Sequence, residues 1–398
     1  MATSYRAKSI RLESGERFPL LVDRVTEVPV LDVIDYSLAY HRTSSINYGK
    51  AKVGAIGLFL EWAEKLYIDI DERFGTGELF AQHEIESLAF ALGQSKRKTV
   101  VVDGLSIPAN VLGDTQANRI DWVLEYISWR GEGVAQAMKL DDPRLPLMNQ
   151  RLGQIDRQLK SLKRKGGGKK RLGLTEEQQV RLFEIVRPDS LENPFRPETR
   201  DRNFMLFLLY FELGVRRAEP LVLKAKHVHL HQNGRIVIEP NPHDPSDQRR
   251  NQPLVKTAGR TLPISDLLSR TMHDYVTKHR SKAPGAKKTP FIVLDTRKGN
   301  PLSLDSIYDM FVLVRDRFPD DFPSDFSTHV LRHTWNDRFM ASAEKAGLKD
   351  ALVRQIANYT MGWTKTSQQS VNYSQREIES QATRILIAMQ QQIMEIAE

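Results

Sequence analysis

The sequence predicts an α+β protein that is mainly helical, with a small antiparallel sheet in its second half. Three observations predict this fold class. Apolar residues recur at helical spacing before residue 160, an Asn-Gly pair separates two β-branched runs near residue 233, and helical spacing returns after residue 303. With 398 residues, the chain is long enough for two to three domains with their own cores.

The first part of the chain, residues 1–162, is predicted to be a helical domain. Two helices carry buried stripes, and Trp122, Tyr126 and Trp129 beside the second stripe are expected in the core. The segment 99–103 is short and β-branched, so a strand and a plain connection both remain open. The stripes consist of Val53, Ile56, Leu60, Ala63 and Tyr67 in the first helix, and of Ile120, Val123, Leu124 and Ile127 in the second.

A basic, glycine-rich linker is predicted at residues 163–173, and it sets the domain boundary. Three consecutive glycines and six cations cannot pack a core, so this segment should stay extended and mobile. We expect this basic segment to lie along a phosphate backbone. The alternative is a solvated spacer that contacts nothing. The six cations are Lys163, Arg164, Lys165, Lys169, Lys170 and Arg171.

The second domain, residues 174–376, is predicted to mix helices with a sheet. Thr175 is a candidate N-cap, and the helix over 203–213 is apolar nearly all round, so it should be buried. Further along, Ser303 and Thr328 are expected to cap two more helices.

The sheet of this domain begins with a predicted hairpin. The pair Asn233-Gly234 tolerates the positive φ angles of a tight turn, and it separates the runs 227–231 and 235–239. A third strand is predicted at 260–264. His227, His229 and His231 share one face of the first strand, so an exposed polar face is expected there, with a metal site as the alternative.

Composition limits the class of protein. The net charge is +8 and the pI about 9.4, which suits a polyanionic partner. No cysteine is present, so disulfides and thiolate metal sites are excluded. The longest apolar run, residues 204–211, falls far short of the ~20 residues of a membrane span. We therefore expect a cytoplasmic protein without a membrane partner.

Two arginines, a histidine and a late tyrosine form the most informative pattern. Arg216 follows the apolar helix within the run 214–219, which ends in Glu219. In the run 329–333, His329, Arg332 and His333 stand at helical positions i, i+3 and i+4 and so face one way. Arginine forks bind phosphate oxygens, and a phenol such as Tyr373 can attack phosphorus. The pattern indicates chemistry on a phosphodiester.

The residues in these segments and their order along the chain resemble the motifs of the tyrosine recombinase (phage integrase) family. The family's motifs correspond to Gly214-Val215-Arg216 with Glu219, His329 to His333, and Gly362-Trp363 ahead of Tyr373. A lysine between the two arginine motifs corresponds to Lys256. The resemblance covers about the last 225 residues by motif and the first part of the chain by general character.

The resemblance implies a catalytic role for six of these residues. Arg216, Arg332 and the Trp363 indole would bind the phosphate, and Tyr373 would attack it to form a 3′-phosphotyrosine. Lys256 would protonate the leaving oxygen, and His329 would accept the tyrosine proton. Glu219 and His333 would support them. Neither a cofactor nor a metal is implied.

The resemblance also implies partners. Double-stranded DNA would be clamped between the helical and catalytic domains by a homo-oligomer, a tetramer when two sites are joined. Accessory DNA-bending proteins or a partner recombinase are further expectations. Arg249 and Arg250, in the polar loop before Lys256, are added to the linker cations as DNA contacts.

The helix over 377–398 carries an apolar seam and is expected to dock on another subunit, with packing on its own domain as the alternative. The seam comprises Ile378, Ala382, Ile385, Met389, Ile393 and Ile396.

Several alternatives remain open. Tyr359 is the rival nucleophile, although its spacing places it on the apolar side of a helix. A type IB topoisomerase or telomere resolvase would use the same chemistry, and a catalytically silent DNA-binding regulator would use the same fold. The expected biological role is the integration, excision or transposition of a mobile element.

Overall fold

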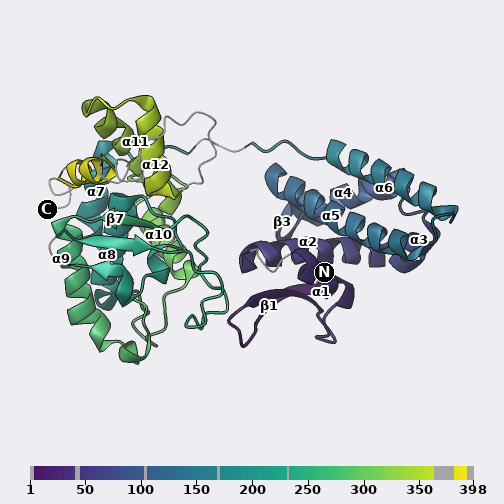
Figure 1. Ribbon diagram of the computed structural model, residues 1–398, viewed down its shortest axis with the longest axis horizontal. Coiled ribbons are helices and arrows are strands. Elements are labelled where there is room, and N and C mark those ends of the chain that lie inside the picture. Colours follow the sequence, from purple (N-terminus) through teal and green to yellow (C-terminus); the bar gives the residue numbers. More distant parts are fainter. Residues whose placement is uncertain are drawn as a thin grey trace. The chain divides into compact units, whose positions relative to one another are not determined.

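The computed structural model describes residues 4–40, 45–102, 105–167, 171–230, 233–362 and 381–391. The chain divides into two compact units, residues 1–169 and 170–398, and each has a hydrophobic core of its own (Figure 1). Helices dominate and the sheets are small and antiparallel, which confirms the predicted fold class. No helix within the described ranges is long and apolar enough to cross a membrane.

The first unit is built around the long helix α2, Ile46–Lys65. Its predicted stripe is buried as far as Ala63, but Tyr67 is almost fully exposed, because α2 ends before it and Tyr67 has a positive φ of 54°. The other helices are α1 Leu31–Tyr40, α3 Ile70–Thr76, α4 Gln82–Leu92, α5 Gly113–Ala137 and α6 Arg144–Ser161. The predicted stripe of α5 is buried, and Tyr126 packs in the core with it.

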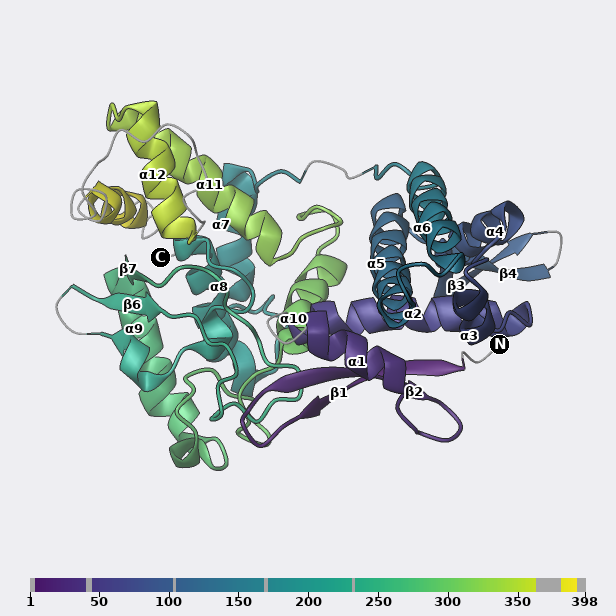
Figure 2. The ribbon, with the colours of Figure 1, turned by 45° about the vertical axis from the view of Figure 1, so that its right-hand side comes forward.

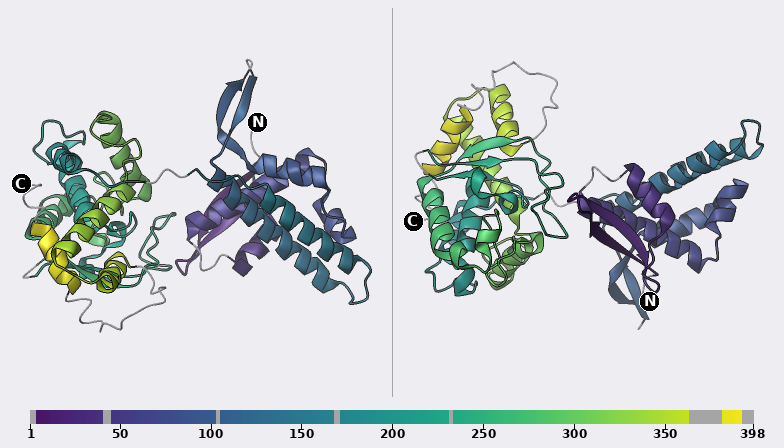
Figure 3. Two further views of the ribbon diagram at one scale, coloured as in Figure 1. Left: turned by 90° about the horizontal axis from the view of Figure 1, so that it is seen from above. Right: turned by 60° about the horizontal axis from the view of Figure 1, so that its bottom comes forward.

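Two hairpins accompany these helices, and the first of them was not predicted from the sequence. Strands β1, Tyr5–Arg11, and β2, Arg17–Asp23, lie along α2 (Figure 2). Gly57 in α2 permits this close approach, since a Cβ there would stand 2.9 Å from Leu21 Cδ1. Strands β3, Gln94–Val102, and β4, Leu105–Asn110, form a second hairpin that projects from the helices of its unit (Figure 3). The open question at 99–103 is thereby settled in favour of a strand for residues 99–102.

The second unit packs its helices around α8, Pro197–Leu213. Every residue from Asn203 to Leu213 is buried, as the sequence predicted. Around it, in chain order, lie α7 Glu176–Val186, α9 Asp266–Asp274, α10 Leu304–Arg317, α11 Thr328–Lys345 and α12 Asp350–Met361. Short turns of helix occupy Pro220–Val222 (η1), Ala225–His227 (η2), Tyr275–His279 (η3), Arg280–Lys282 (η4) and Ala286–Lys288 (η5).

The predicted helix caps are largely confirmed. The Thr175 hydroxyl accepts from the Gln178 amide at 3.3 Å, and Ser303 accepts from the Ser306 amide at 3.1 Å. The prediction for Thr328 was wrong by one position. Helix α11 already begins at Thr328, and Ser327 occupies the N-cap position.

The sheet of the second unit has the order β5-β6-β7, with antiparallel neighbours. Its strands are β5 Val228–His229, β6 Arg235–Ile238 and β7 Arg260–Pro263, each slightly shorter than predicted. Asn233 has a φ of 60°, the left-handed conformation that the predicted Asn-Gly turn requires.

Residues 381–391 form a helix that packs on its own unit. Ala382, Ile385 and Met389 of the predicted seam are buried there together with Leu386. Two polar contacts fasten this helix: Arg338 donates to the Met389 carbonyl at 3.0 Å, and the Gln390 amide donates to the Pro263 carbonyl at 2.9 Å. The seam residues Ile378, Ile393 and Ile396 lie outside the described residues.

Candidate active site

Arg216 lies directly after α8, where the chain reverses. Gly214 ends the helix in the left-handed conformation, with a φ of 58°, and a Cβ there would stand 2.6 Å from Cγ of the buried Trp335. The turn that follows is fixed by Glu219, whose carboxylate accepts from the Arg216 backbone amide at 2.8 Å. The Arg216 side chain remains 37% exposed, so it can reach a ligand at the surface.

Arg332 reaches the same place from α11. Its guanidinium donates to the Gly214 carbonyl at 2.6 Å and to the Met361 carbonyl at 3.3 Å. Arg216 donates to that same Met361 oxygen at 2.9 Å. The structure therefore brings together two arginines that are 116 positions apart in the sequence, 216 and 332. We call Arg216 and Arg332 the arginine pair.

The electrostatics of the arginine pair favour an anion. Burial lowers the pKa of Arg216, and burial followed by the repulsion from Arg216 lowers the pKa of Arg332 to about 10. Both guanidiniums still carry their charge at neutral pH. Because both cations are partly buried and repel each other, a phosphate with its two charged oxygens would be a stronger partner than the Met361 carbonyl that they share.

His329 and His333 lie one turn apart on α11, and both remain accessible to solvent although neighbouring side chains cover part of His329. Partial burial and then the nearby charges of Arg171, Arg332, Arg217 and His333 lower the pKa of His329. The imidazole is therefore neutral near pH 7 and can accept a proton.

Lys256 is exposed in the segment that joins β6 to β7, and its neighbours Val255 and Thr257 are buried. The Thr257 hydroxyl donates to Glu219 at 3.0 Å. Because Glu219 also accepts from the backbone amide of Arg216, the chain next to Lys256 is tied to the turn that carries Arg216.

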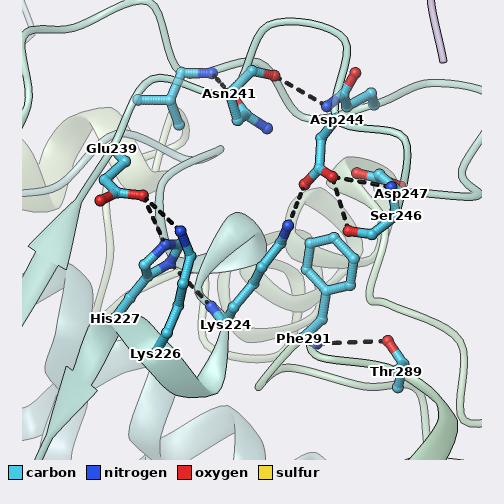
Figure 4. A network of polar contacts seen from close by, with 12 residues as sticks. Lys224, Lys226, His227, Glu239, Asn241, Asp244, Ser246, Asp247, Thr289 and Phe291 are labelled. Atoms are coloured by element: carbon cyan, nitrogen blue, oxygen red, sulfur yellow. Dashed lines mark hydrogen bonds and ion pairs between the residues drawn. The ribbon is translucent and has the colours of Figure 1, made fainter. Parts of the chain in front are cut away.

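The polar loop before Lys256 is a fixed structure. Asn241 joins the two ends of the loop. Its side-chain nitrogen donates to the Pro253 carbonyl at 3.0 Å, and its side-chain oxygen accepts from the Val255 backbone amide at 2.7 Å. Lys224 binds Asp244 at 2.7 Å on the outer part of the loop, with its ammonium 5.3 Å from the centre of the Phe291 ring (Figure 4).

The structure places Arg249 inside this loop, away from any outside ligand. Its guanidinium pairs with the fully buried Asp247 at 2.7 Å and donates to the carbonyls of Leu221 and Leu302. Arg249 therefore anchors the loop through contacts inside the protein. The neighbouring Arg250 is exposed.

The cations of the predicted linker fall into two groups. Lys163 pairs with Asp121, and the Arg164 amide donates to Gln116 at 3.0 Å, so the start of the segment lies on α5 instead of extending freely. Lys165 and Arg171 are exposed, and Arg171 lies 3.4 Å from Asp325. Lys169 and Lys170 lie outside the described residues.

Two further predicted residues also lie outside the described residues. These are Trp363 and Tyr373. The rival Tyr359 is described: its hydroxyl donates to the Thr261 carbonyl at 3.1 Å and its ring packs against the core. This engagement supports a structural role for Tyr359.

The alternative of a histidine metal site finds no support among the described residues, which contain no group of three or more candidate ligands. His227 is occupied by other partners. Its Nδ1 accepts from the Lys224 amide at 3.1 Å, and its Nε2 lies 3.0 Å from Glu239 (Figure 4). His231 lies outside the described residues.

One residue of the site was missed by the sequence analysis. Arg260 of β7 is 1% exposed and pairs with Glu219 through two contacts, at 2.8 and 3.1 Å. The signal that could have found it is the alternation of the strand, which puts Arg260 on the same side as the apolar Leu262 and Ile264. An arginine on a buried strand face requires a carboxylate.

Comparison with known proteins agrees with the motifs. Residues 173–368 match the model of the phage integrase family. Solved structures similar to this chain include the XerH site-specific recombinase bound to difH substrate in a pre-cleavage complex, at 16% identity and a TM-score of 0.45, covering 86% of this chain and 76% of that one. The post-cleavage complex of XerH with palindromic difH is similar at 15% identity and a TM-score of 0.42, covering 92% of each chain.

The crystal structure of the XerA recombinase is a third similar structure, at 15% identity and a TM-score of 0.34, covering 91% of this chain and 97% of that one. The comparison with curated protein sequences found no match.

Proposed function

Since this chain belongs, through residues 173–368, to the phage integrase family of tyrosine-type site-specific recombinases, we propose that it cuts and rejoins double-stranded DNA through a 3′-phosphotyrosine. The observation that carries the proposal is the convergence of Arg216 and Arg332 on one carbonyl oxygen. A fixed pair of guanidiniums stabilises the charge that develops on a phosphate during attack.

The proposed reaction assigns each residue one step. The Tyr373 oxygen attacks phosphorus and its proton passes to the neutral His329, while the bond from phosphorus to the 5′ oxygen breaks. Lys256 gives that leaving oxygen a proton. Arg216 and Arg332 neutralise the two non-bridging oxygens, and Trp363 adds a donor. Because the new ester retains the energy of the broken bond, attack by another 5′ hydroxyl can rejoin the strand without an added energy source.

The experiment is designed without knowledge of the target site. A pool of nicked duplexes with random sequence around the nick is incubated with the protein, and adducts that survive detergent are recovered and sequenced. A nick lets the short cleaved piece diffuse away, so adducts accumulate. The substitution Tyr373→Phe should abolish them, while the matched control Tyr359→Phe should retain them. Adducts that persist undiminished in Tyr373→Phe would overturn the proposal.

The same adducts separate the alternatives. A silent DNA-binding regulator would yield none. A type IB topoisomerase or a telomere resolvase would yield adducts, but it would not join strands of two different duplexes. Mixing two labelled duplexes that carry the recovered sequence tests this, and recombinant products are expected. If those sequences occur at the ends of a mobile element, the further proposal of integration, excision or transposition is supported.

We also propose that the active assembly is a homo-oligomer, a tetramer when two sites are joined. The surface that would couple the subunits is the helix of residues 381–391 with its flanking segments. It would first have to leave its own unit, where Arg338 and Gln390 hold it. The substitution Gln390→Ala removes one of these contacts, and it should raise the fraction of tetramer on recovered duplex DNA in sedimentation. An unchanged fraction would count against subunit docking by this helix.

The DNA contacts outside the active site are proposed on charge alone. Lys165, Arg171 and Arg250 are the exposed cations among those members of the predicted set that the structure describes. Their replacement by glutamine should weaken binding to any duplex and lower its salt dependence, since each phosphate contact releases counterions.

A further inference from the structure

Arg260 is a buried charge close to the arginine pair. It extends from β7, and its side chain is 1% exposed. Its guanidinium uses Nη1 and Nη2 for the two oxygens of Glu219, and its Nε donates to the Thr360 carbonyl at 2.7 Å. A guanidinium with these partners and no access to the surface cannot reach a DNA phosphate. Its role must act through Glu219 or through the end of α12.

Glu219 is equally buried, and it is the carboxylate that organises the turn carrying Arg216. Its oxygens accept from the Arg216 backbone amide at 2.8 Å, from the Thr257 hydroxyl at 3.0 Å and from Arg260. The Arg216 guanidinium stands slightly further off, with 3.9 Å between Nη1 and Oε1 of Glu219. Two arginines therefore lie within reach of one buried carboxylate, and only Arg260 forms the close pair.

This difference in distance decides which arginine is available to a ligand. A buried carboxylate needs a cationic partner, and removal of that partner is strongly unfavourable. If Arg260 were absent, the nearest remaining cation would be Arg216. A closer pair between Arg216 and Glu219 would turn the Arg216 fork inward and remove it from the arginine pair.

We propose that Arg260 is a positioning residue of the strand-cleavage reaction, which neutralises Glu219 so that Arg216 remains free to bind the scissile phosphate. The inference rests on the proposed function. It assigns no contact with DNA to Arg260. It predicts that loss of Arg260 slows the cleavage step because Arg216 then turns away from the phosphate.

The glycine at the end of α12 shows how closely this residue is fitted. Gly362 has a φ of 61°, and a Cβ there would lie 2.8 Å from Nη1 of Arg260 and 2.8 Å from the Cβ of Thr257. Arg260 thus fills the space under the chain reversal, from which the sequence continues to Trp363 and Tyr373. The bond to Thr360 keeps the guanidinium in the orientation that pairs with Glu219.

A double-mutant cycle tests the proposal, with the nicked duplex recovered from the random pool as substrate. Cleavage by saturating protein is followed in a single turnover for wild type, Arg260→Gln, Arg216→Lys and the double variant. Arg260→Gln should slow cleavage at least tenfold, with DNA affinity changed less than threefold. Because both substitutions disable Arg216, the double variant should cleave as slowly as Arg216→Lys alone. Multiplied losses, or an Arg260→Gln rate equal to wild type, would overturn the proposal.

A second variant keeps the test decisive if Arg260→Gln does not fold. In Glu219→Gln/Arg260→Gln neither charge is left without its partner, and replacement of a whole buried pair is tolerated better than loss of one member. This double variant should fold and cleave at least as fast as Glu219→Gln, because without the carboxylate nothing draws Arg216 inward. A double variant that cleaves more slowly than Glu219→Gln contradicts the assignment, because Arg260 would then act other than through Glu219. Absence of adducts with the wild-type protein would instead refute the proposed function itself.

Discussion

Arg332 donates to the carbonyl oxygen of Gly214 at 2.6 Å, and this bond joins the first turns of α11 to the reversal after α8. The position of Arg332 therefore depends on the backbone that leads to Arg216. That backbone is left-handed at Gly214, and it lies against the ring of Trp335. The arginine pair is held by a backbone conformation that favours glycine.

The first prediction concerns this glycine. Gly214→Ala should destabilise the second unit by more than the ~1–2 kcal/mol of a left-handed alanine, because its Cβ would also displace the buried Trp335. The measurement is the free energy of unfolding of the second unit, from hydrogen exchange of α8 amides. Gly285→Ala is the matched control: its φ is +65° and nothing lies within 4 Å, so only the backbone cost applies. Equal losses would refute the packing argument.

The second prediction concerns the charge of the arginine pair. Arg216→Lys and Arg332→Lys keep the cation but lose the planar fork, so each should slow single-turnover cleavage by about 10²–10³, the loss typical of one removed transition-state donor. DNA affinity should change far less. Arg315→Lys on α10, where the arginine pairs with its neighbour Asp316, is the control and should cleave normally. A lysine variant that cleaves at the wild-type rate would contradict the proposed role of that arginine.

The third prediction concerns the pH dependence of cleavage. The pKa of His329 lies below its ordinary 6.5, because of partial burial and then neighbouring cations. The imidazole is therefore neutral above pH 6.5, and cleavage should be lost only as pH falls through the lowered pKa. His329→Gln should remove this acid limb and slow cleavage by about 10²–10⁴.

The control for the pH profile is His333→Gln, which should retain the acid limb. Single-turnover rates between pH 5 and 8 provide the measurement. A break at or above pH 6.5 in the wild-type protein would show that another group titrates, and it would remove His329 from the role of proton acceptor.

Local signals in the sequence predicted much of this fold correctly. The buried run 203–213 needed only its own apolar residues, and the turn at Asn233 needed only the tolerance of Asn-Gly for positive φ. The caps Thr175 and Ser303 are equally local. In each case the determining contacts lie within a few residues of the chain.

The features that were missed depend on contacts between distant segments. The hairpin β1–β2 packs closely on Gly49 and Gly57 of α2. A glycine in a helical sequence does not indicate which strand will pack against it. Arg260 is buried because it pairs with Glu219, which lies 41 positions earlier in the sequence. Arg249 lies inside its loop because it donates to the carbonyls of residues 221 and 302, which are far from it in the sequence. Residue type alone suggested a DNA contact at Arg249 and gave no role to Arg260.

The fourth prediction concerns the loop before Lys256. Asp247→Asn removes the carboxylate that pairs with Arg249 at 2.7 Å, and loss of one member of a buried pair costs about 3–5 kcal/mol. Hydrogen exchange should therefore rise in residues 241–255, and cleavage should slow because Lys256 follows directly. Arg250→Gln, at an exposed position, is the control and should leave exchange unchanged. Wild-type protection of the loop in Asp247→Asn would show that the pair does not anchor it.

The fifth prediction concerns stability and pH. Burial raises the pKa of Glu212 to about 7, although its bonds from Ser265 oppose this shift. The unfolded chain loses this proton near pH 4.5, whereas the folded chain retains it to about pH 7. Stability is therefore full below pH 4.5 and falls by roughly 1.4 kcal/mol per pH unit as pH rises across that window.

Hydrogen exchange of α8 amides at pH 5 and pH 8, corrected for intrinsic rates, measures this effect. Glu212→Gln removes the titration and should become progressively more stable than wild type as pH rises, because a neutral amide needs no proton to remain buried. Glu198→Gln, at an exposed position on the same helix, should follow the wild-type profile. Parallel profiles for Glu212→Gln and wild type would mean that Glu212 does not hold a proton in the folded protein, and that its bonds from Ser265 outweigh its burial.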